Sequence, residues 1–268
     1  MSEPEVKVIL DSISPKGDRI TTFELKYWRP LLPEMNTHRV FSRNAASSRA
    51  RGFEKNLQQV ITSPWFPEHW NAEQPGMQGG EEFPDDVKAF LNEEVSLLAK
   101  EVAIKLQHMN LITKMLTGKE IHKQYLNRYL EPFMPVTQLV TATDWDNFLN
   151  LRLSAEAQPE MRDVAEKIKF LLDTHRPAKR VAHYPYITEE EYFSMNLDHI
   201  FMVSVARCAR VAYRSSSEKT YDIQKDIDLY NRLLENKHMS PFEHVAYPHE
   251  GRHANFNGWE SLRETINL

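Results

Sequence analysis

Cysteine is almost absent from this sequence: Cys208 is the only one in 268 residues. A single thiol cannot form a disulfide within the chain, so a disulfide-stapled fold is excluded and a reducing compartment is expected. Cys208 lies in an apolar stretch with helical spacing, which is typical of a core residue. The sequence therefore offers no obvious cysteine nucleophile.

Long apolar runs are also lacking. No stretch approaches the ~20 apolar residues that span a bilayer, and the first residues contain neither a basic segment nor a long apolar one. We therefore expect a soluble, cytoplasmic protein that does not bind a membrane. The composition, 41% hydrophobic and 26% charged, is that of a globular protein with a sizeable core.

An excess of basic residues is the third absence. The chain has 33 Lys and Arg against 38 Asp and Glu, a net charge of −5. Non-specific binding to nucleic acid normally needs a positive surplus. Nucleic acid is therefore not an expected partner.

One segment nevertheless gathers cations and hydroxyls. Residues 37–49 contain one histidine, three arginines and four Ser or Thr. Pro30 and Pro33 predict the start of a helix that carries this segment, and on such a helix His38, Ser42, Ala45 and Arg49 share a face. Arginine forks and serine hydroxyls suit phosphate, so the pattern predicts a site for a phosphorylated small molecule, with a solvated polar face as the alternative.

The spacing of apolar residues predicts two N-terminal strands, at 6–10 and 20–28, followed mainly by helices. Helices are expected from 52 to about 63, from 85 onward, at 119–130 and 145–152, from 159, and at 197–213 and 220–236. The apolar stripe of the long helix from 85 is predicted to be core: Leu91, Val95, Leu98, Val102, Leu106 and Met109. The aromatic loop at 63–84 is either a cover over a pocket or a loop held to the surface.

Three blocks of the sequence resemble flavin-dependent thymidylate synthases of the ThyX type. Thr37-His38-Arg39, seven residues and Ser47 resemble the family signature Arg-His-Arg-x7-Ser, with Thr37 in place of the first arginine. Residues 127–132 are similar to the family's Arg-x-x-x-Pro helix end. Residues 147–152, Asn-Phe-Leu-Asn-Leu-Arg, are similar to its Asn-Phe-Leu-x-Leu-Arg block.

A fourth similar region is out of order. Residues 209–213 and 233–244 resemble a segment that precedes the signature in the family but follows it here. The resemblance therefore implies a circular permutation, with the N-terminal strands packed near residues 240–268. It implies one ThyX-like domain over 1–268: 1–176 carry the motif and the long helices, and 197–268 correspond to the family's N-terminal part. The implied fold is α+β, a central, mostly antiparallel sheet flanked by long helices, assembled as a homotetramer with active sites at subunit junctions.

The resemblance implies an activity: C5-methylation of dUMP to dTMP with FAD, using methylenetetrahydrofolate as carbon donor and NADPH as reductant. Arg152 is the residue expected to be catalytic, because a permanent cation in an apolar setting can stabilise charge on the pyrimidine. A structural salt bridge is the alternative role for Arg152. The implied nucleotide-binding residues are Glu34, Thr37, Ser47, Ser48, Arg49, Arg128 (at the phosphate) and Arg152. The implied FAD-binding residues are Thr37, His38, Arg39, Asn147, His238 and Ser240.

Several positions depart from the family pattern. Glu34 replaces a glutamine, and a carboxylate can accept a hydrogen bond from the exocyclic amine of cytosine, so methylation of dCMP or hydroxymethylation of a pyrimidine stays open. Ala45 replaces a glutamate, Glu156 replaces a histidine, and residues 141–144 lack an arginine. A non-catalytic relative that binds nucleotides or RNA through residues 37–51 also stays open. His244, His249 and His253 match no metal-ligand spacing, so no metal is expected.

Overall fold

A five-stranded sheet forms the centre of the protein. The computed structural model describes residues 3–212 and 222–266. The strand order is β3-β4-β2-β1-β5, and all neighbours are antiparallel except β1 and β5. The strands are β1 (Glu5–Ile13), β2 (Arg19–Trp28), β3 (Ser42–Ala45), β4 (Pro135–Ala142) and β5 (Ala178–Lys179). The predicted α+β class with a mostly antiparallel central sheet is confirmed, and both N-terminal strands are longer than the predicted ones.

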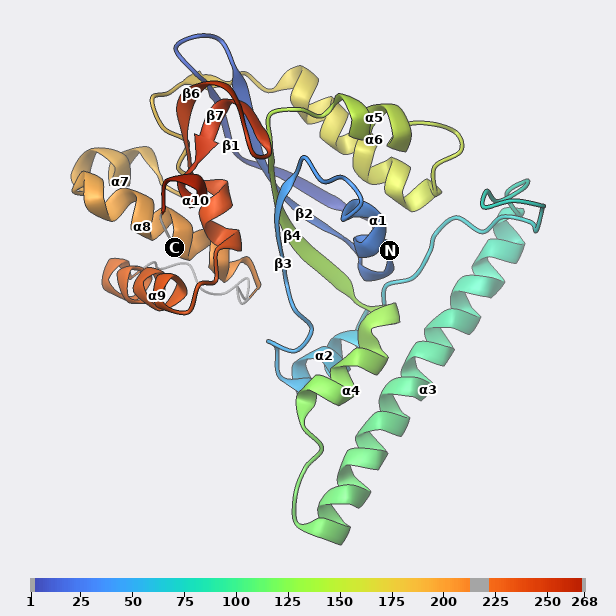
Figure 1. The fold of residues 1–268 in the computed structure, drawn as a ribbon. Coiled ribbons are helices and arrows are strands. Elements are labelled where there is room, and N and C mark those ends of the chain that lie inside the picture. The colour runs from blue at the N-terminus through green and yellow to red at the C-terminus, as the bar shows by residue number, and fades with distance from the viewer. Residues whose placement is uncertain (1–2, 213–221, 267–268) are drawn as a thin grey trace.

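Helices lie on both faces of this sheet, α5 and α6 on one and α8 on the other (Figure 1). The α-helices of the described residues are α1 (Leu32–Met35), α2 (Phe53–Thr62), α3 (Asp85–Thr117), α4 (Lys123–Leu130), α5 (Asp146–Arg152), α6 (Pro159–Thr174), α7 (Glu189–Ser194), α8 (Leu197–Ala209), α9 (Ile223–Glu235) and α10 (Leu262–Thr265). The helix predicted from 119 begins at Lys123. The predicted ends at Tyr213 and Thr220 lie outside the described residues.

The alternation of β2 determines which side is packed. Phe23, Leu25 and Tyr27 share one face, because side chains alternate along a strand. They lie in a core with α5 and α6, where Phe23 meets Trp145 edge-on at 5.2 Å between ring centroids. The opposite face carries α8, and Cys208 is buried there as predicted. The sheet therefore holds α5 in a fixed position against its first face.

The predicted helix through the motif is wrong. α1 ends at Met35, residues 37–40 form turns, and Ser42–Ala45 is strand β3, paired with β4 from Thr141 to Gln138. The outer edge of β4 offers a row of backbone donors and acceptors, and a short strand satisfies them. The motif side chains therefore do not line up on a helix face.

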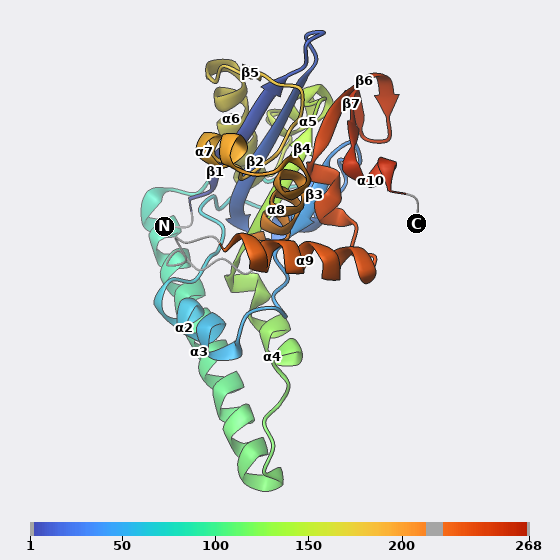
Figure 2. The same ribbon diagram turned by 90° about the vertical axis from the view of Figure 1, so that its left-hand side faces the viewer.

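The prediction that the stripe on the long helix is core is only partly right. Leu106 is buried, but Leu98 and Met109 are 49% and 46% exposed. Figure 1 and Figure 2 show α3 extending away from the sheet, beside α2 and α4 for part of its length. Helical spacing identifies an apolar side but not what covers it, and here α2 and α4 cover only a middle portion. No helix among residues 3–212 and 222–266 is long and apolar enough to cross a membrane.

The turn between β1 and β2 packs on the C-terminal hairpin, β6 (Ala246–His253) and β7 (Phe256–Ser261). Trp259 is buried with Ile20, and its Nε1 donates to the Asp18 carbonyl at 3.0 Å. Gly258 has φ +75°, and a Cβ there would lie 2.2 Å from a side-chain atom of Asp18, so glycine is required. The N-terminal strands thus contact residues 240–268, as the permutation requires; the permutation itself stays a prediction.

A chain of buried hydrogen bonds joins three strands to the C-terminal region. His183 Nδ1 lies 2.8 Å from Ser12 Oγ, and its Nε2 lies 2.7 Å from Thr22 Oγ1. Thr22 contacts Thr141 at 2.6 Å, and Thr141 contacts His244 Nδ1 at 2.8 Å. All five residues are buried. Polar groups in a core are tolerated when they are bonded in this way.

Candidate functional site

Arg152 is held by α1 and by the segment that follows it. It is the last residue of α5, which the buried Phe148 anchors one turn earlier. Arg152 Nε donates to His38 Nε2 at 2.8 Å, and Nη2 donates to Thr37 Oγ1 at 3.2 Å. Nη1 donates to the Glu34 carboxylate in an ion pair. All three nitrogens of one guanidinium are therefore oriented by residues 34–38.

The surroundings of His38 keep its ring neutral. Burial lowers the pKa of His38 to about 4, and the nearby cation of Arg152 adds to this. A neutral ring that accepts at Nε2 carries its proton on Nδ1. The ring packs edge-on against Phe148 at 5.0 Å and lies 5.7 Å from Phe41. His38 thus acts as a rigid acceptor for Arg152 at neutral pH.

The Arg152 side chain still reaches the surface, where it is 16% exposed. A guanidinium has five N–H groups, and the bonds to His38, Glu34 and Thr37 use one on each nitrogen. A second N–H on each of Nη1 and Nη2 takes part in no bond within the described residues. The arrangement can present a positioned, partly desolvated cation with N–H groups to an oxygen-bearing ligand.

A second group lies in the turn before α2. Asn127 of α4 donates to the Ser48 carbonyl at 2.8 Å and to the Arg51 carbonyl at 3.0 Å, which fixes this turn. Ser48 Oγ and Asn127 Oδ1 are buried without a partner in the part of the chain that the structure describes. Ser47 and Arg49 are exposed. Unsatisfied polar atoms beside an exposed arginine are suited to an anionic ligand.

The expected nucleotide-binding residues thus divide into two groups. Glu34, Thr37 and Arg152 lie at α5, whereas Ser47, Ser48 and Arg49 lie at α4. Arg128 lies on α4, next to Asn127 of the second group, and is exposed. It forms an ion pair with Glu131 at 2.9 Å. No described hydrogen bond or ion pair joins the two groups within the chain.

The expected FAD-binding residues are only partly brought together. Ser240 Oγ donates to the Arg43 carbonyl at 3.2 Å. Burial lowers the pKa of Arg43, and the charge of Arg39 lowers it further, so Arg39 also lies near Arg43. Arg39 and Ser240 are therefore on the same side of the molecule. Asn147 and His238 are exposed and make no described contact with this group.

Sequence reasoning missed the central position of Arg43 and Asn44. Asn44 Nδ2 donates to the Cys208 carbonyl at 2.9 Å, and its Oδ1 lies 3.5 Å from Ser240 Oγ. Both residues are in the motif, but their neighbours become adjacent only when β3 pairs with β4. Two departures from the family pattern are also placed: Ala45 lies on β3 and Glu156 is exposed. Among the described residues, no group of His, Cys, Asp and Glu could hold a metal ion.

Comparisons with known proteins give structural matches alone: no protein-family model and no curated protein matches the sequence. The UMP/dUMP methylase PolB from Streptomyces cacaoi, bound with 5-Br UMP, matches with a TM-score of 0.51 and 14% identity, over 64% of this chain and 89% of PolB. The flavin-dependent thymidylate synthase ThyX from Helicobacter pylori, complexed with FAD and dUMP, gives a TM-score of 0.37 and 22% identity, over 59% of this chain and 68% of ThyX. Over the matched part, the chain therefore shares the fold of PolB.

Proposed function

We propose that this protein is an FAD-dependent enzyme that methylates C5 of dUMP to give dTMP, with methylenetetrahydrofolate as carbon donor and NADPH as reductant. The observation that carries the proposal is the Arg152 guanidinium, oriented on all three nitrogens and still open to a ligand. The fold shared with PolB, which is described as a UMP/dUMP methylase, supports it.

Arg152 would bind the pyrimidine ring and act as the catalytic group. Its N–H groups suit a carbonyl oxygen or a deprotonated ring nitrogen, and its charge stabilises negative charge that develops on the ring during attack. Neutral His38 and Thr37 fix the direction of the guanidinium, so little reorganisation is needed in the transition state. The mechanism requires no cysteine.

The phosphate would bind at Ser47, Ser48, Arg49 and Arg128. The unpartnered Ser48 hydroxyl and the exposed Arg49 fit an anion. Since no hydrogen bond or ion pair among the described residues joins this group to Arg152, we propose that a complete site forms between subunits of a homotetramer. The uncovered apolar residues of α3 support such an assembly: Leu97, Leu98, Ile104, Leu111, Ile112, Met115 and Leu116.

FAD would be held by Thr37, His38, Arg39, Asn147, His238 and Ser240. The donor set fits the group: Arg39 supplies a cation for the diphosphate, and hydroxyl, amide and imidazole groups supply hydrogen bonds. Bound reduced flavin would supply the electrons that convert the transferred one-carbon unit to a methyl group. The residues named here bind and orient it.

The test is an enzyme assay in which dUMP and dCMP are offered in parallel. Purified protein should show flavin absorbance and, with NADPH and methylenetetrahydrofolate, convert dUMP to dTMP. Arg152→Ala should abolish turnover while flavin stays bound, because Arg152 is assigned to the pyrimidine. Arg232→Ala, an exposed arginine on α9, is the matched control and should retain full activity. Colourless protein without product would contradict the proposal and favour a non-catalytic nucleotide binder.

One observation favours a second substrate. The Glu34 carboxylate lies in the ion pair with Arg152, so an acceptor is present where the ring would bind. A carboxylate can accept from the exocyclic amine of cytosine while it keeps the arginine contact. dCMP methylation, or hydroxymethylation of either pyrimidine, is therefore the second candidate, and the product formed from dCMP in the same assay decides it.

A further inference from the structure

The outer side of β1 is open along its first half. On this side β1 pairs with β5, through Ser12 and Ile13, and the described residues contain no strand beside Glu5–Ile9. The Ile13 carbonyl accepts from the Arg180 amide, so the backbone N–H and C=O of Ile13 point outward, toward β5. The backbone groups of Ser12, the preceding residue, therefore point toward β2, where Ser12 pairs with Ile20. On β2, the backbone groups of Ile20 and of every second residue after it point toward β1.

This alternation determines the orientation of the Val6 backbone. β2 pairs without irregularity with β4, so Glu24 and Lys26 face β1 as the earlier even-numbered residues do. Their partners on β1 are Lys7 and Glu5, which use their backbone groups in that ladder. The N–H and C=O of Val6, between them, consequently point away from the sheet. An unpaired edge of this kind is a template for another strand.

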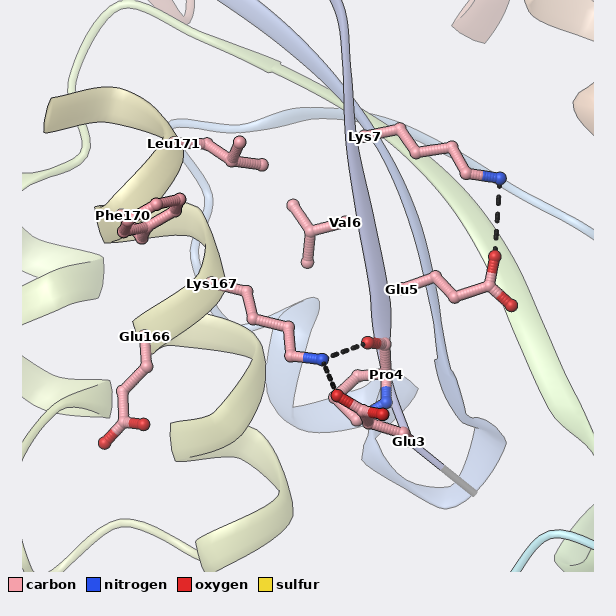
Figure 3. Close-up of a pocket in the computed structure, with 9 residues that line it drawn as sticks. All are labelled: Glu3, Pro4, Glu5, Val6, Lys7, Glu166, Lys167, Phe170 and Leu171. Atoms are coloured by element: carbon pink, nitrogen blue, oxygen red, sulfur yellow. Dashed lines mark hydrogen bonds and ion pairs between the residues drawn. The ribbon is translucent and has the colours of Figure 1, made fainter. Parts of the chain in front are cut away.

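A cavity lies along the same stretch. It has a volume of about 580 Å³ and is lined by residues 3–7 and by Glu166, Lys167, Phe170 and Leu171 of α6. Figure 3 shows Val6 pointing into the space between β1 and α6. Phe170 is 66% exposed there. Lys167 donates to the Pro4 carbonyl at 2.9 Å, at the N-terminal limit of the open edge.

The sequence of the edge is complementary to itself. In Glu5-Val6-Lys7 a negative and a positive residue flank one apolar residue. An antiparallel copy centred on Val6 places Glu5 opposite Lys7 twice and Val6 opposite Val6. Both charged side chains are on the surface: Glu5 contacts Lys7 at 3.3 Å and Lys26 at 2.6 Å.

We propose that β1 of one copy pairs antiparallel with β1 of a second copy, about a two-fold axis through Val6. The pairing joins the two central sheets and satisfies the outward N–H and C=O of Val6. The two Phe170 side chains come to lie beside the joined strands on the α6 side. Such a contact is isologous, so it closes on itself. It does not depend on the proposed activity.

The first test is a cross-link. In an antiparallel hydrogen-bonded pair opposite Cα atoms are about 5.5 Å apart, within disulfide range. Val6→Cys should therefore give a covalent dimer on mild oxidation. Lys7→Cys is the matched control, because the two copies of this position would be about 8 Å apart and should not link. The unmodified protein should not link, since Cys208 is buried.

The second test is charge reversal. Glu5→Lys opposes like charges at both ends of the pairing and should weaken self-association about tenfold. Adding Lys7→Glu restores complementarity and should restore association, whereas Lys225→Glu, on exposed α9 surface, should change nothing. Sedimentation equilibrium measures the self-association of each variant. Absence of the Val6→Cys dimer, or a double variant as weak as Glu5→Lys, overturns the proposal; so does an edge that binds a different protein while this chain stays unpaired.

Discussion

Replacing His244 with asparagine should reduce the acid sensitivity of this protein. His244 is fully buried, and burial lowers its pKa to about 3 from an ordinary value of 6.5. The folded-state pKa lies below the unfolded one, so the unfolded chain binds a proton first as the pH falls. The contribution of neutral His244 to the unfolding free energy is therefore complete above pH 6.5 and is lost as the pH falls toward about 3.

The size of the effect follows from the shift. Each pH unit between the two pKa values changes the unfolding free energy by about 1.4 kcal/mol per histidine, so moving from pH 6.5 to pH 4 removes about 3 kcal/mol. His183, whose pKa burial also lowers to about 3, should contribute a similar amount. The combined loss from the two histidines is a large part of the 5–15 kcal/mol unfolding free energy that is typical of a folded domain.

Asparagine is the substitution that isolates the titration. Its amide can occupy the position of Nδ1 and keep the bond to Thr141, which His244 makes at 2.8 Å. It also removes Nε2, which is buried and has no partner among the described residues. We expect a modest loss at pH 7, about 1 kcal/mol from the smaller side chain.

The assay is urea unfolding of both proteins at several pH values between about 4 and 7. The slope of unfolding free energy against pH should be lower in His244→Asn by about 1.4 kcal/mol per pH unit between pH 4 and 6. His108→Asn, at an exposed position on α3, is the control for the chemical change alone. Equal slopes for His244→Asn and the unmodified protein would refute the reasoning.

Three further substitutions test other parts of the structure. Glu34→Gln keeps a hydrogen bond to Arg152 but removes the negative charge of the acceptor. The binding affinity for dUMP relative to dCMP, measured by calorimetry, should therefore rise about tenfold. An unchanged ratio of the two affinities would count against a role for Glu34 in pyrimidine choice. Asp226→Ala removes a carboxylate that lies 3.1 Å from the fully buried Arg207 and should lower the unfolding free energy by about 3 kcal/mol, measured with urea; a midpoint shift near zero would contradict it. Gly258→Ala introduces a Cβ at φ +75° against the β1 to β2 turn and should destabilise by about 2 kcal/mol; calorimetry with an unchanged Tm would show that the turn simply moves aside.

Secondary structure followed the sequence closely where apolar spacing and end signals agreed. The helix predicted at 145–152 is observed as Asp146–Arg152, and the one predicted from 159 begins at Pro159. The helix predicted for residues 37–49 is wrong because local spacing allowed a helix, whereas β3 forms backbone hydrogen bonds with β4, almost one hundred residues later in the chain. Pairing with a distant strand has no signature in a local window.

Within the site, the sequence identified the residue types but not their arrangement. Arg152 and His38 are 114 positions apart and become partners because α5 and the segment after α1 pack on the same face of the sheet. The placement of Ser48 against α4 and the closeness of Ser240 to Arg43 likewise could not be predicted from the spacing of residues in the sequence. The alternative role of Arg152, a salt bridge, is partly realised in its ion pair with Glu34.

The sequence alone determined the absence of a disulfide framework, the α+β class, most helix positions and the set of arginines, hydroxyls and histidine from which a site can be built. These depend on composition and on periodicity within about ten to twenty residues. The tertiary structure decided which of these side chains meet, that only a middle portion of the apolar side of α3 is covered, and that the first half of β1 is an open edge. Such properties depend on contacts between distant segments, whose free energy comes from burial and backbone pairing that no local pattern records.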